Sequence, residues 1–391
     1  MLFLSDWFWA FSALVVPLYV LVPRSLKLLW VLAASLVFQY HFAGPAGMWP
    51  IVVLGVLTYG VALVPPGRGR HLTAVSMVVL VGALVFYKYG EFFLHSVRVP
   101  LHGLGLAPAD WLSGWASPAV PLGISFFTFE FVHYLYEVRV RGHAPVRNPL
   151  HFAVFAVFFP TLAAGPIKRF PDFVPQLSAL DNPTVEQWLA GVRRILLGLF
   201  KKVCIADLLV ELITPLENTP NPTVRVVLAL AVLQGWRIYY DFAGYTDMAI
   251  GLGQTLGLQV PENFDRPYFA TSLREFWRRW HMSLSTWIRD YVYIPLGGNR
   301  VRRGFNLLLA MVICGLWHGA AWNFALWGLW HGAGLALEAA LRLRRPQLFE
   351  DGRAERAVGW LVTYTWVSLG WLLFFYPVER LTAMASAVQG W

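Results

Sequence analysis

The chain has 391 residues, of which 57% are hydrophobic and 14% are charged, and its mean hydropathy is +0.54. These values lie outside the usual range of a soluble globular domain. No stretch is polar enough and long enough to form such a domain. We therefore expect a single membrane domain over 1–391, with amino-terminal helices in 1–116, a motif-bearing core in 117–341 and a carboxy-terminal helix region in 342–391.

The formal charge of +9 does not indicate a nucleic-acid partner, because Lys and Arg occur in short groups between apolar runs and form no basic domain. The 19 Trp and 15 Tyr residues fit interfacial belts, so membrane lipid is the expected surrounding partner. Only Cys204 and Cys314 are present, each within an apolar run, so the sequence indicates neither a disulfide framework nor a thiolate metal site.

Apolar runs follow one another along most of the chain and predict an all-α, polytopic membrane protein with about ten or eleven transmembrane helices. Several runs are shorter than the roughly 20 residues of a perpendicular span, and Gly or Pro interrupts others, so we also expect broken, re-entrant or interfacial helices. The first run lacks a basic flank and a cleavage site, so it is expected to be retained. The runs are 7–22, 28–43, 49–65, 72–94, 117–136, 150–166, 188–213, 223–258, 305–325, 322–341 and 357–377.

Basic residues in the first loops predict the orientation. Arg24 and Lys27 follow the first run, Arg68 and Arg70 follow the third, and the segment between the second and third runs has no Lys or Arg. Basic loops face the cytoplasm, which places the amino terminus outside. Basic residues after the fifth run and at the patch Arg342, Arg344 and Arg345 are expected to be cytoplasmic.

The stretch 259–304 mixes Arg, Asp, Trp and His without a clean apolar run, so it does not cross lipid as one helix. Within it, Arg274, Arg278 and His281 have the spacing i, i+4, i+7. This spacing predicts that they lie on one face of a helix. We expect a short helix at the interface or along a cavity.

His318 lies in an apolar run between Trp317 and Gly319, and a neutral imidazole at that depth suits a general base near pH 7. A histidine that hydrogen-bonds a neighbouring helix would fit equally well. His331 repeats the context Trp-His-Gly, so this tripeptide alone does not mark chemistry.

His281 follows Arg278 and Arg279, whose positive charge would favour a neutral imidazole able to accept a proton. An interfacial anchor is the alternative. The two guanidinium groups match the phosphate groups of a nucleotide-bearing donor, and they match lipid headgroups equally well.

Asp241 and Asp247 are six residues apart, so on one helix they point about 120° away from each other. Paired-carboxylate catalysis is therefore not expected, and Asp247 fits a structural partner of Arg or Tyr. The sequence contains no GxSxG, P-loop, HExxH or CxxC motif.

Five ordered blocks resemble the membrane-bound O-acyltransferase (MBOAT) family, in particular its bacterial branch with alginate acetylation and teichoic acid D-alanylation proteins. The blocks are PLGISFFTF at 121–129, FFPTLAAGPIKR at 158–169, YDFAGYTDMAIG at 240–251, the stretch 261–298 and GLWHGA at 315–320. Two departures are Glu137, where relatives often carry Asp, and the end at Trp391, which would mean fewer terminal helices or a truncated gene.

The resemblance implies helices around a central channel in the bacterial inner membrane, with His318 required for acyl transfer and His281 near the same tunnel. The candidate donor- or substrate-binding residues are Arg278, Arg279, Trp280, Trp317, Asp247 and Asn263. The resemblance also implies acetyl-CoA as the acyl donor and no permanently bound cofactor. The implied acceptor is a hydroxyl of an extracytoplasmic glycan, which receives the acyl group directly or through a periplasmic acetyltransferase partner. In this hypothesis His318 is the general base, and His281 or a nearby polar group stabilises the oxyanion or positions the donor. D-Alanyl transfer from a carrier protein and transport without acyl chemistry are the alternatives.

Overall fold

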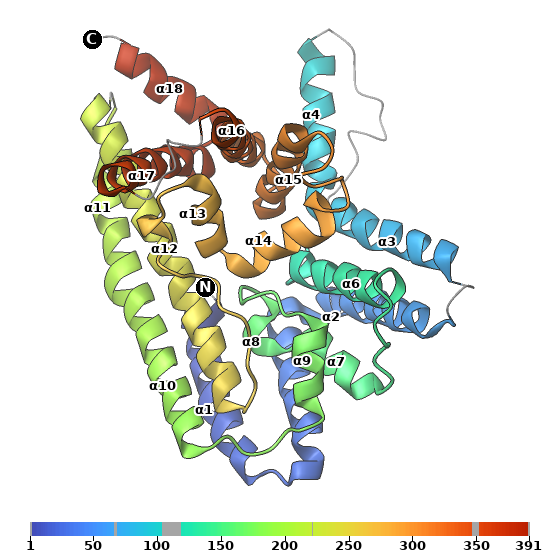
Figure 1. Cartoon of the computed structure of the whole chain (residues 1–391). Helices are drawn as coiled ribbons and strands as arrows, with labels where there is room; N and C mark the ends of the chain where they lie inside the picture. The colour runs from blue at the N-terminus through green and yellow to red at the C-terminus, as the bar shows by residue number, and fades with distance from the viewer. Residues whose placement is uncertain (1, 66–68, 104–118, 221, 346–351, 390–391) are drawn as a thin grey trace. The chain divides into compact units, whose positions relative to one another are not determined.

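A computed structural model of the chain describes residues 2–65, 69–103, 119–220, 222–345 and 352–389 (Figure 1). The structure is 80% helical and contains no strand in these ranges, which confirms the all-α prediction. Arg68 and the first two residues of the predicted run 117–136 lie outside the described residues.

The chain forms two compact units. The first consists of residues 1–193 with 249–260, and the second of residues 194–248 with 261–391. The boundaries do not coincide with those of the three predicted segments, and the organisation as one membrane domain stays a prediction.

In the first unit, most helices follow the predicted apolar runs, and Gly or Pro changes the course of three of these runs. The runs 28–43 and 49–65 join into one helix, α2, which is kinked at Gly44 (φ 63°) just before Pro45. The run 150–166 is divided at Phe158, because Pro160 starts a new short helix. The elements are η1 (Leu2–Leu4), α1 (Asp6–Leu21), η2 (Arg24–Leu26), α2 (Lys27–Leu63), α3 (Arg70–Leu84), the π-helix η3 (Val85–Tyr89), α4 (Gly90–Gly103), α6 (Ile124–Arg139), α7 (Pro149–Val157), α8 (Phe159–Leu162) and α9 (Phe170–Leu177).

Three helical stretches in the described ranges are long and apolar enough to cross a membrane, namely Arg24–Leu63, Arg70–Arg98 and Arg353–Phe375. Two shorter apolar helices are Asp6–Leu21 and Arg303–His318. The broken run at 150–166 shows why fewer helices meet this length than the ten or eleven runs suggested. The full number of crossings stays a prediction.

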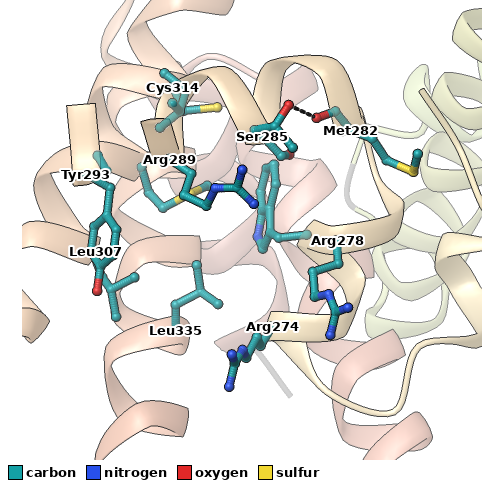
Figure 2. A pocket seen from close by; sticks show the side chains of 14 residues that line it. Arg274, Arg278, Met282, Ser285, Arg289, Tyr293, Leu307, Cys314 and Leu335 are labelled. Carbon is teal, nitrogen blue, oxygen red and sulfur yellow. Dashed lines mark hydrogen bonds between the residues drawn. The ribbon is translucent and has the colours of Figure 1, made fainter. Parts of the chain in front are cut away.

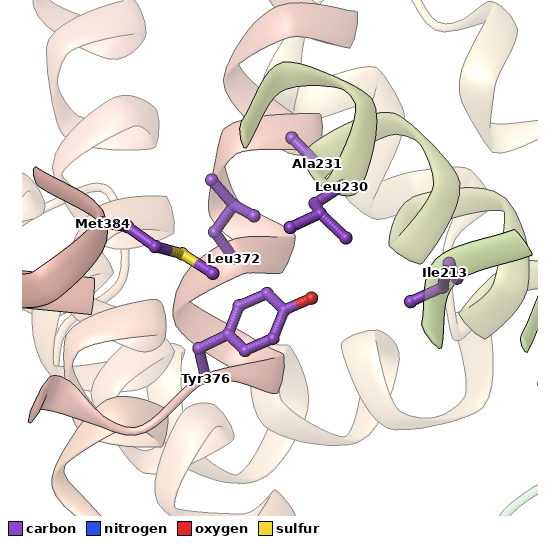
Figure 3. Packing of buried hydrophobic residues seen from close by; sticks show 6 residues of the cluster. All are labelled: Ile213, Leu230, Ala231, Leu372, Tyr376 and Met384. Carbon is purple, nitrogen blue, oxygen red and sulfur yellow. The ribbon is translucent and has the colours of Figure 1, made fainter. Parts of the chain in front are cut away.

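The second unit holds the carboxy-terminal helices, and helices α10 and α12 each pass from one unit into the other. Tyr376 and Leu372 pack with Ile213, Leu230 and other apolar residues of α11, α12 and α18 in a buried cluster (Figure 3). The elements are α10 (Val185–Leu199), the π-helix η4 (Phe200–Ala206), α11 (Asp207–Glu217), α12 (Val224–Thr255), η5 (Pro267–Phe269), α13 (Leu273–Arg279), α14 (Met282–Ile288), the π-helix η6 (Arg289–Tyr293), α15 (Arg303–His318), α16 (Trp322–Arg344), α17 (Arg353–Phe375) and α18 (Val378–Gln389).

Glycines bring α15 and α16 into close contact as a helical hairpin. A Cβ atom on Gly315 would overlap the carbonyl oxygen of Phe324, and one on Gly328 would overlap the backbone of Met311. Small residues of this kind let helix backbones approach closely in a membrane protein. The hairpin fixes the carboxy-terminal end of α15, where His318 lies.

Candidate active site

Helix α13 begins with a capping box that the sequence encodes locally. The Ser272 hydroxyl accepts a hydrogen bond from the Glu275 amide (3.2 Å), and the Glu275 carboxylate accepts bonds from the amide (2.7 Å) and hydroxyl (2.9 Å) of Thr271. These bonds satisfy amide groups that would otherwise lack partners at the helix start. The predicted short helix is therefore present, and its start is fixed.

The predicted common face of Arg274, Arg278 and His281 is wrong, because the helix ends at Arg279. Trp280 is extended, and His281 adopts a left-handed conformation (φ 41°, ψ 54°) before α14 begins. Only a few per cent of non-glycine residues have positive φ, although His is enriched among them. The backbone turn, rather than helical spacing, sets the direction of the imidazole.

The side chain of Asn263 contacts the Nδ1 side of the His281 ring. Its side-chain oxygen accepts hydrogen bonds from the Ser283 amide (3.2 Å) and hydroxyl (2.6 Å), and lies 3.3 Å from His281 Nδ1. Because an amide N–H only donates, the Asn263 atom must be the oxygen, and His281 Nδ1 must carry the proton. The neutral ring then has a lone pair at Nε2.

His281 is buried, with 1% of its surface exposed, and its Nε2 atom has no hydrogen-bond partner among the described residues. Burial lowers the pKa of His281 well below its usual range, and the neighbouring His318 lowers it further. The ring is therefore neutral near pH 7. A buried acceptor without a partner is unfavourable unless a ligand supplies a donor.

His318 is the last residue of α15, and Gly319 after it is extended. The ring is half-buried. Its centroid lies 6.3 Å from that of His281, 5.4 Å from Trp327 and 5.2 Å from Phe374. Two of the sequence-predicted residues thus come together as a pair of imidazoles beside aromatic rings.

A cavity of about 600 Å³ lies in the second unit (Figure 2), and it is lined by residues close in sequence to the two histidines but not by the histidines themselves. Its wall includes Met282, the residue after His281, and Cys314, one helical turn before His318. Three guanidinium-bearing residues, Arg274, Arg278 and Arg289, line it together with apolar side chains of α15 and α16. Positive charge on an apolar wall suits an anionic ligand with an apolar part.

The predicted pair Arg278 and Arg279 is divided between two roles. Arg278 lines the cavity, whereas the guanidinium of Arg279 forms an ion pair with Glu275 at 2.7 Å. Trp280 is buried and packs between Phe276 and Trp371. Arg279 and Trp280 therefore support the helix, and Arg278 alone of these three faces the cavity.

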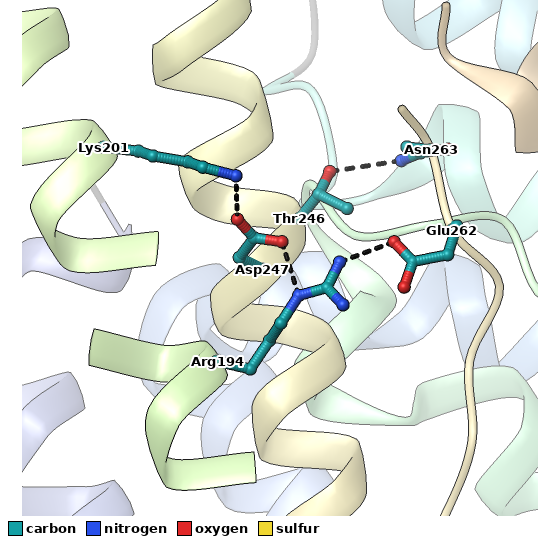
Figure 4. A network of polar contacts seen from close by, with 6 residues as sticks. All are labelled: Arg194, Lys201, Thr246, Asp247, Glu262 and Asn263. Atoms are coloured by element: carbon teal, nitrogen blue, oxygen red, sulfur yellow. Dashed lines mark hydrogen bonds and ion pairs between the residues drawn. The ribbon is translucent and has the colours of Figure 1, made fainter. Parts of the chain in front are cut away.

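Trp317 stays near the site, with its ring 5.9 Å from His281, but Asp247 does not reach the histidines. The Asp247 carboxylate is bound by Arg194 (2.6 Å) and Lys201 (2.5 Å), and Arg194 also binds Glu262 at 2.6 Å (Figure 4). These ion pairs fit the interpretation of Asp247 as a partner of Arg, and its candidate role in donor or substrate binding stays a prediction. The network sits next to Asn263, which donates to Thr246 at 3.3 Å.

Asp241 has different partners from Asp247, as the helical spacing predicts. Its carboxylate is 2.8 Å from Lys202, which also binds Asp207. The two aspartates of α12 therefore belong to separate ion pairs and form no paired-carboxylate site.

His331 lies one helix away, in the middle of α16, and is completely buried. Its ring contacts the rings of Trp277 (5.3 Å between centroids) and Trp327 (4.9 Å). Neither ring nitrogen has a hydrogen-bond partner in the described part of the chain. The second Trp-His-Gly therefore belongs to an aromatic core.

Sequence reasoning missed Arg289 and the support that Asn263 gives to His281. Arg289 begins the π-helix η6, a local geometry that side-chain spacing does not reveal and that often occurs at functional sites. Asn263 contacts His281 across 18 residues, a separation without periodic signal. Both residues lie in the block 261–298, and only Asn263 of the two is among the candidate binding residues that the sequence suggests.

Comparison with known proteins identifies the chain. A sequence model described as MBOAT, membrane-bound O-acyltransferase family, matches residues 139–378, a range that contains both histidines and the cavity. A protein of Azotobacter vinelandii named "Probable alginate O-acetylase AlgI" is 37% identical over 391 residues, covering 96% of this chain and 75% of that protein.

Two further relatives carry other acceptor names. The peptidoglycan O-acetyltransferase of Helicobacter pylori is 33% identical over 93% of this chain and 73% of its own length. The teichoic acid D-alanyltransferase of Streptococcus thermophilus is 29% identical over 72% of this chain and 75% of its own length. The chain therefore belongs to the membrane-bound O-acyltransferase family and is a membrane acyltransferase.

Proposed function

We propose that this acyltransferase moves an acetyl group from acetyl-CoA to a hydroxyl of an extracytoplasmic polysaccharide, with His318 as the general base. The observation that carries the proposal is the pairing of His318 with a neutral, buried His281 whose Nε2 has no partner among the described residues. The names of the alginate and peptidoglycan relatives favour acetyl as the group and a polysaccharide as the acceptor.

The chemistry needs one proton acceptor and no enzyme nucleophile. The His318 imidazole takes the proton of the attacking hydroxyl, whose oxygen then forms a bond with the thioester carbonyl carbon. The tetrahedral intermediate collapses, the C–S bond breaks, and the thiolate takes the proton back from the imidazolium. General base catalysis of this kind contributes about 10²–10⁴-fold to the rate.

His281 has a narrower role than the sequence suggested. With its proton at Nδ1 bound to Asn263, the neutral ring offers only a lone pair at Nε2 and has no N–H for an oxyanion. The single proton of the attacking hydroxyl goes to His318, so we assign the Nε2 lone pair of His281 to accept a hydrogen bond from a neighbouring hydroxyl of the acceptor and so to orient the attacking oxygen toward the carbonyl.

The proposed donor site is the cavity whose lining includes Met282 and Cys314, which are close in sequence to the two histidines. The cationic side chains of Arg274, Arg278 and Arg289 suit the phosphate groups of acetyl-CoA, and the apolar wall toward Cys314 suits its pantetheine arm. We place this donor side on the cytoplasmic face of the inner membrane, with the amino terminus outside, because the basic loops of the sequence favour that orientation. The acceptor is reached directly or through an extracytoplasmic partner protein.

The test is acetyl transfer by the purified protein in proteoliposomes, with radiolabelled acetyl-CoA and either alginate or peptidoglycan fragments as acceptor. We expect labelled polysaccharide with the wild type and background label with His318→Ala. Arg225→Gln, a charge change on α12 at a residue that does not line the cavity, is the control and should retain activity.

Three results would change the proposal. Label transfer from a D-alanyl carrier but not from acetyl-CoA would replace the donor. Full turnover by a folded His318→Ala protein would remove the general base. Movement of polysaccharide across the membrane without any labelled product would favour transport.

A further inference from the structure

A second basic cavity lies in the first unit, away from the residues of the proposed acyl transfer. It has a volume of about 1080 Å³, which is at the upper end for ligand pockets. We propose that it binds the phosphate headgroup of an anionic membrane phospholipid. The proposal does not rest on the acyl-transfer chemistry.

The cavity is formed where three helices meet. Helix α2 ends at Leu63, α3 begins at Arg70, and α6 ends at Arg139 (Figure 1). Arg70, Arg139 and Arg147 line it with their positive charges. Its remaining wall is largely apolar, with Leu63, Val64, Ala74, Met77, Val138 and Val140 among the lining residues.

The three arginines keep their charge available. Arg139 is held by neutral groups, since its Nε donates to the Thr73 hydroxyl (3.2 Å) and its Nη1 donates to the Val64 carbonyl. The nearby Glu137 is engaged by Arg141 (2.7 Å) and His143 (2.9 Å). Within the described ranges, no carboxylate forms an ion pair with Arg70, Arg139 or Arg147. A guanidinium cluster of this kind favours a phosphate.

The amino-terminal end of α3 adds to the positive potential of the arginines. Its N-cap is Gly69, which has no side chain to bond the first amides, so the helix begins without a side-chain cap. The positive end of a helix stabilises an anion by about 0.3–1 kcal/mol in exposed settings. The helix end and the arginines act in the same direction.

The position of the cavity at the ends of two candidate spans favours a lipid over a soluble phosphate as its ligand. Two candidate spans, Arg24–Leu63 and Arg70–Arg98, end and begin at the cavity. The basic loop between them is expected to be cytoplasmic, where the leaflet is rich in anionic lipid. Leu63 and Val140 are 44% and 59% exposed beside the arginines, and they offer an acyl chain an apolar surface. A free phosphate ion would not use that surface.

The experiment is native mass spectrometry of the delipidated full chain in neutral detergent, titrated separately with phosphatidylglycerol, phosphatidylcholine and glycerol 3-phosphate. We expect phosphatidylglycerol to bind at least about tenfold more tightly than phosphatidylcholine. The double variant Arg70→Gln, Arg147→Gln should lose about tenfold in that affinity. It leaves in place Arg139, whose hydrogen bonds hold α6 to α2 and α3.

Two further variants make the result specific. The control Arg24→Gln, Arg344→Gln removes the same charge at exposed sites outside the cavity and should bind phosphatidylglycerol like the wild type. Ala74→Trp fills the cavity while keeping every charge, and should weaken binding as strongly as the double arginine variant. It decides the question if the double variant fails to fold.

The proposal is overturned if phosphatidylcholine binds as tightly as phosphatidylglycerol, or if the cavity variants match the control. Binding of glycerol 3-phosphate as tight as that of the lipid would assign the cavity to a soluble phosphate and also overturn it. Acyl transfer in a defined detergent, measured in parallel, separates this outcome from a failure of the proposed function.

Discussion

The chain contains the tripeptide Trp-His-Gly twice, and the structure gives its two histidines different surroundings. His318 ends α15, is half-buried and lies 6.3 Å from the ring of His281. His331 lies inside α16, is completely buried and is surrounded by aromatic rings. A helix end beside a second imidazole can admit a substrate, whereas the interior of a packed helix cannot. Local sequence therefore does not define a site without the element that carries it.

The largest expected effect contrasts these two histidines directly. His318→Asn should lower acetyl transfer by about 10³-fold, because the proton acceptor is lost. His331→Phe keeps an aromatic ring of similar size in an aromatic core, so activity should stay within about threefold. Labelled product from matched proteoliposomes measures both. A large loss of acetyl transfer in His331→Phe at normal thermal stability would contradict the contrast between His318 and His331.

The second-largest effect concerns Asn263, whose side chain supports the imidazole of His281. Asn263→Ala removes the oxygen that binds His281 Nδ1 and two groups of Ser283. A small misplacement of a reacting group can lower rates by about 10²-fold, and we expect a loss of about ten- to a hundredfold in kcat. Thr246→Val removes only the acceptor of the Asn263 amide group and should have a smaller effect. Equal activities of wild type and Asn263→Ala would contradict this role.

The close packing of α15 against α16 should be sensitive to one added methyl group. Gly315→Ala places a Cβ against the carbonyl oxygen of Phe324, and overpacking of this kind is expected to destabilise the protein by about 1–3 kcal/mol. Gly304→Ala is the control, since its nearest neighbour would be the Ala336 Cβ at 3.9 Å. Thermal unfolding in detergent compares them, and a Tm for Gly315→Ala equal to that of the control would refute close packing.

The smallest effect is a pH dependence of stability. The pKa of His281 is depressed in the folded protein by burial and by His318, so the unfolded chain binds a proton that the folded chain does not. Stability is therefore complete above the unfolded pKa of about 6.5 and falls as pH decreases, by about 1.4 kcal/mol per unit. The wild type should lose more Tm between pH 7 and pH 5 than His281→Gln. An equal loss of Tm in the two proteins would show that the charge of His281 does not differ between the folded and the unfolded chain.

Much of the fold could be predicted from sequence because apolar periodicity is a local signal. The runs identified most helices, and the general prediction that Gly or Pro would break some of them is met at Gly44 with Pro45 and at Pro160. The family blocks brought attention to His281 and His318, and the structure places their rings near each other. Their catalytic roles stay predictions.

The rest depended on contacts that no local pattern contains. The spacing of Arg274, Arg278 and His281 suggested one face, but the left-handed turn at His281 ended that regularity. Arg278 and Arg279 are adjacent in sequence, yet one faces a cavity and the other binds Glu275. The support from Asn263 comes from a separate loop, so its position is a product of tertiary packing.

The turn at His281 has a consequence for motion. The Trp280 amide closes the end of α13 by bonding Phe276, and the Met282 amide bonds Asn263 (2.9 Å), so the backbone is fastened on both sides of the imidazole. Displacing this part of the backbone would require unwinding the end of one helix and the start of the next. The backbone that carries the imidazole is therefore a stationary part of the site, and we expect gating during the catalytic cycle to come from side chains that change rotamer, such as the exposed arginines of the cavity.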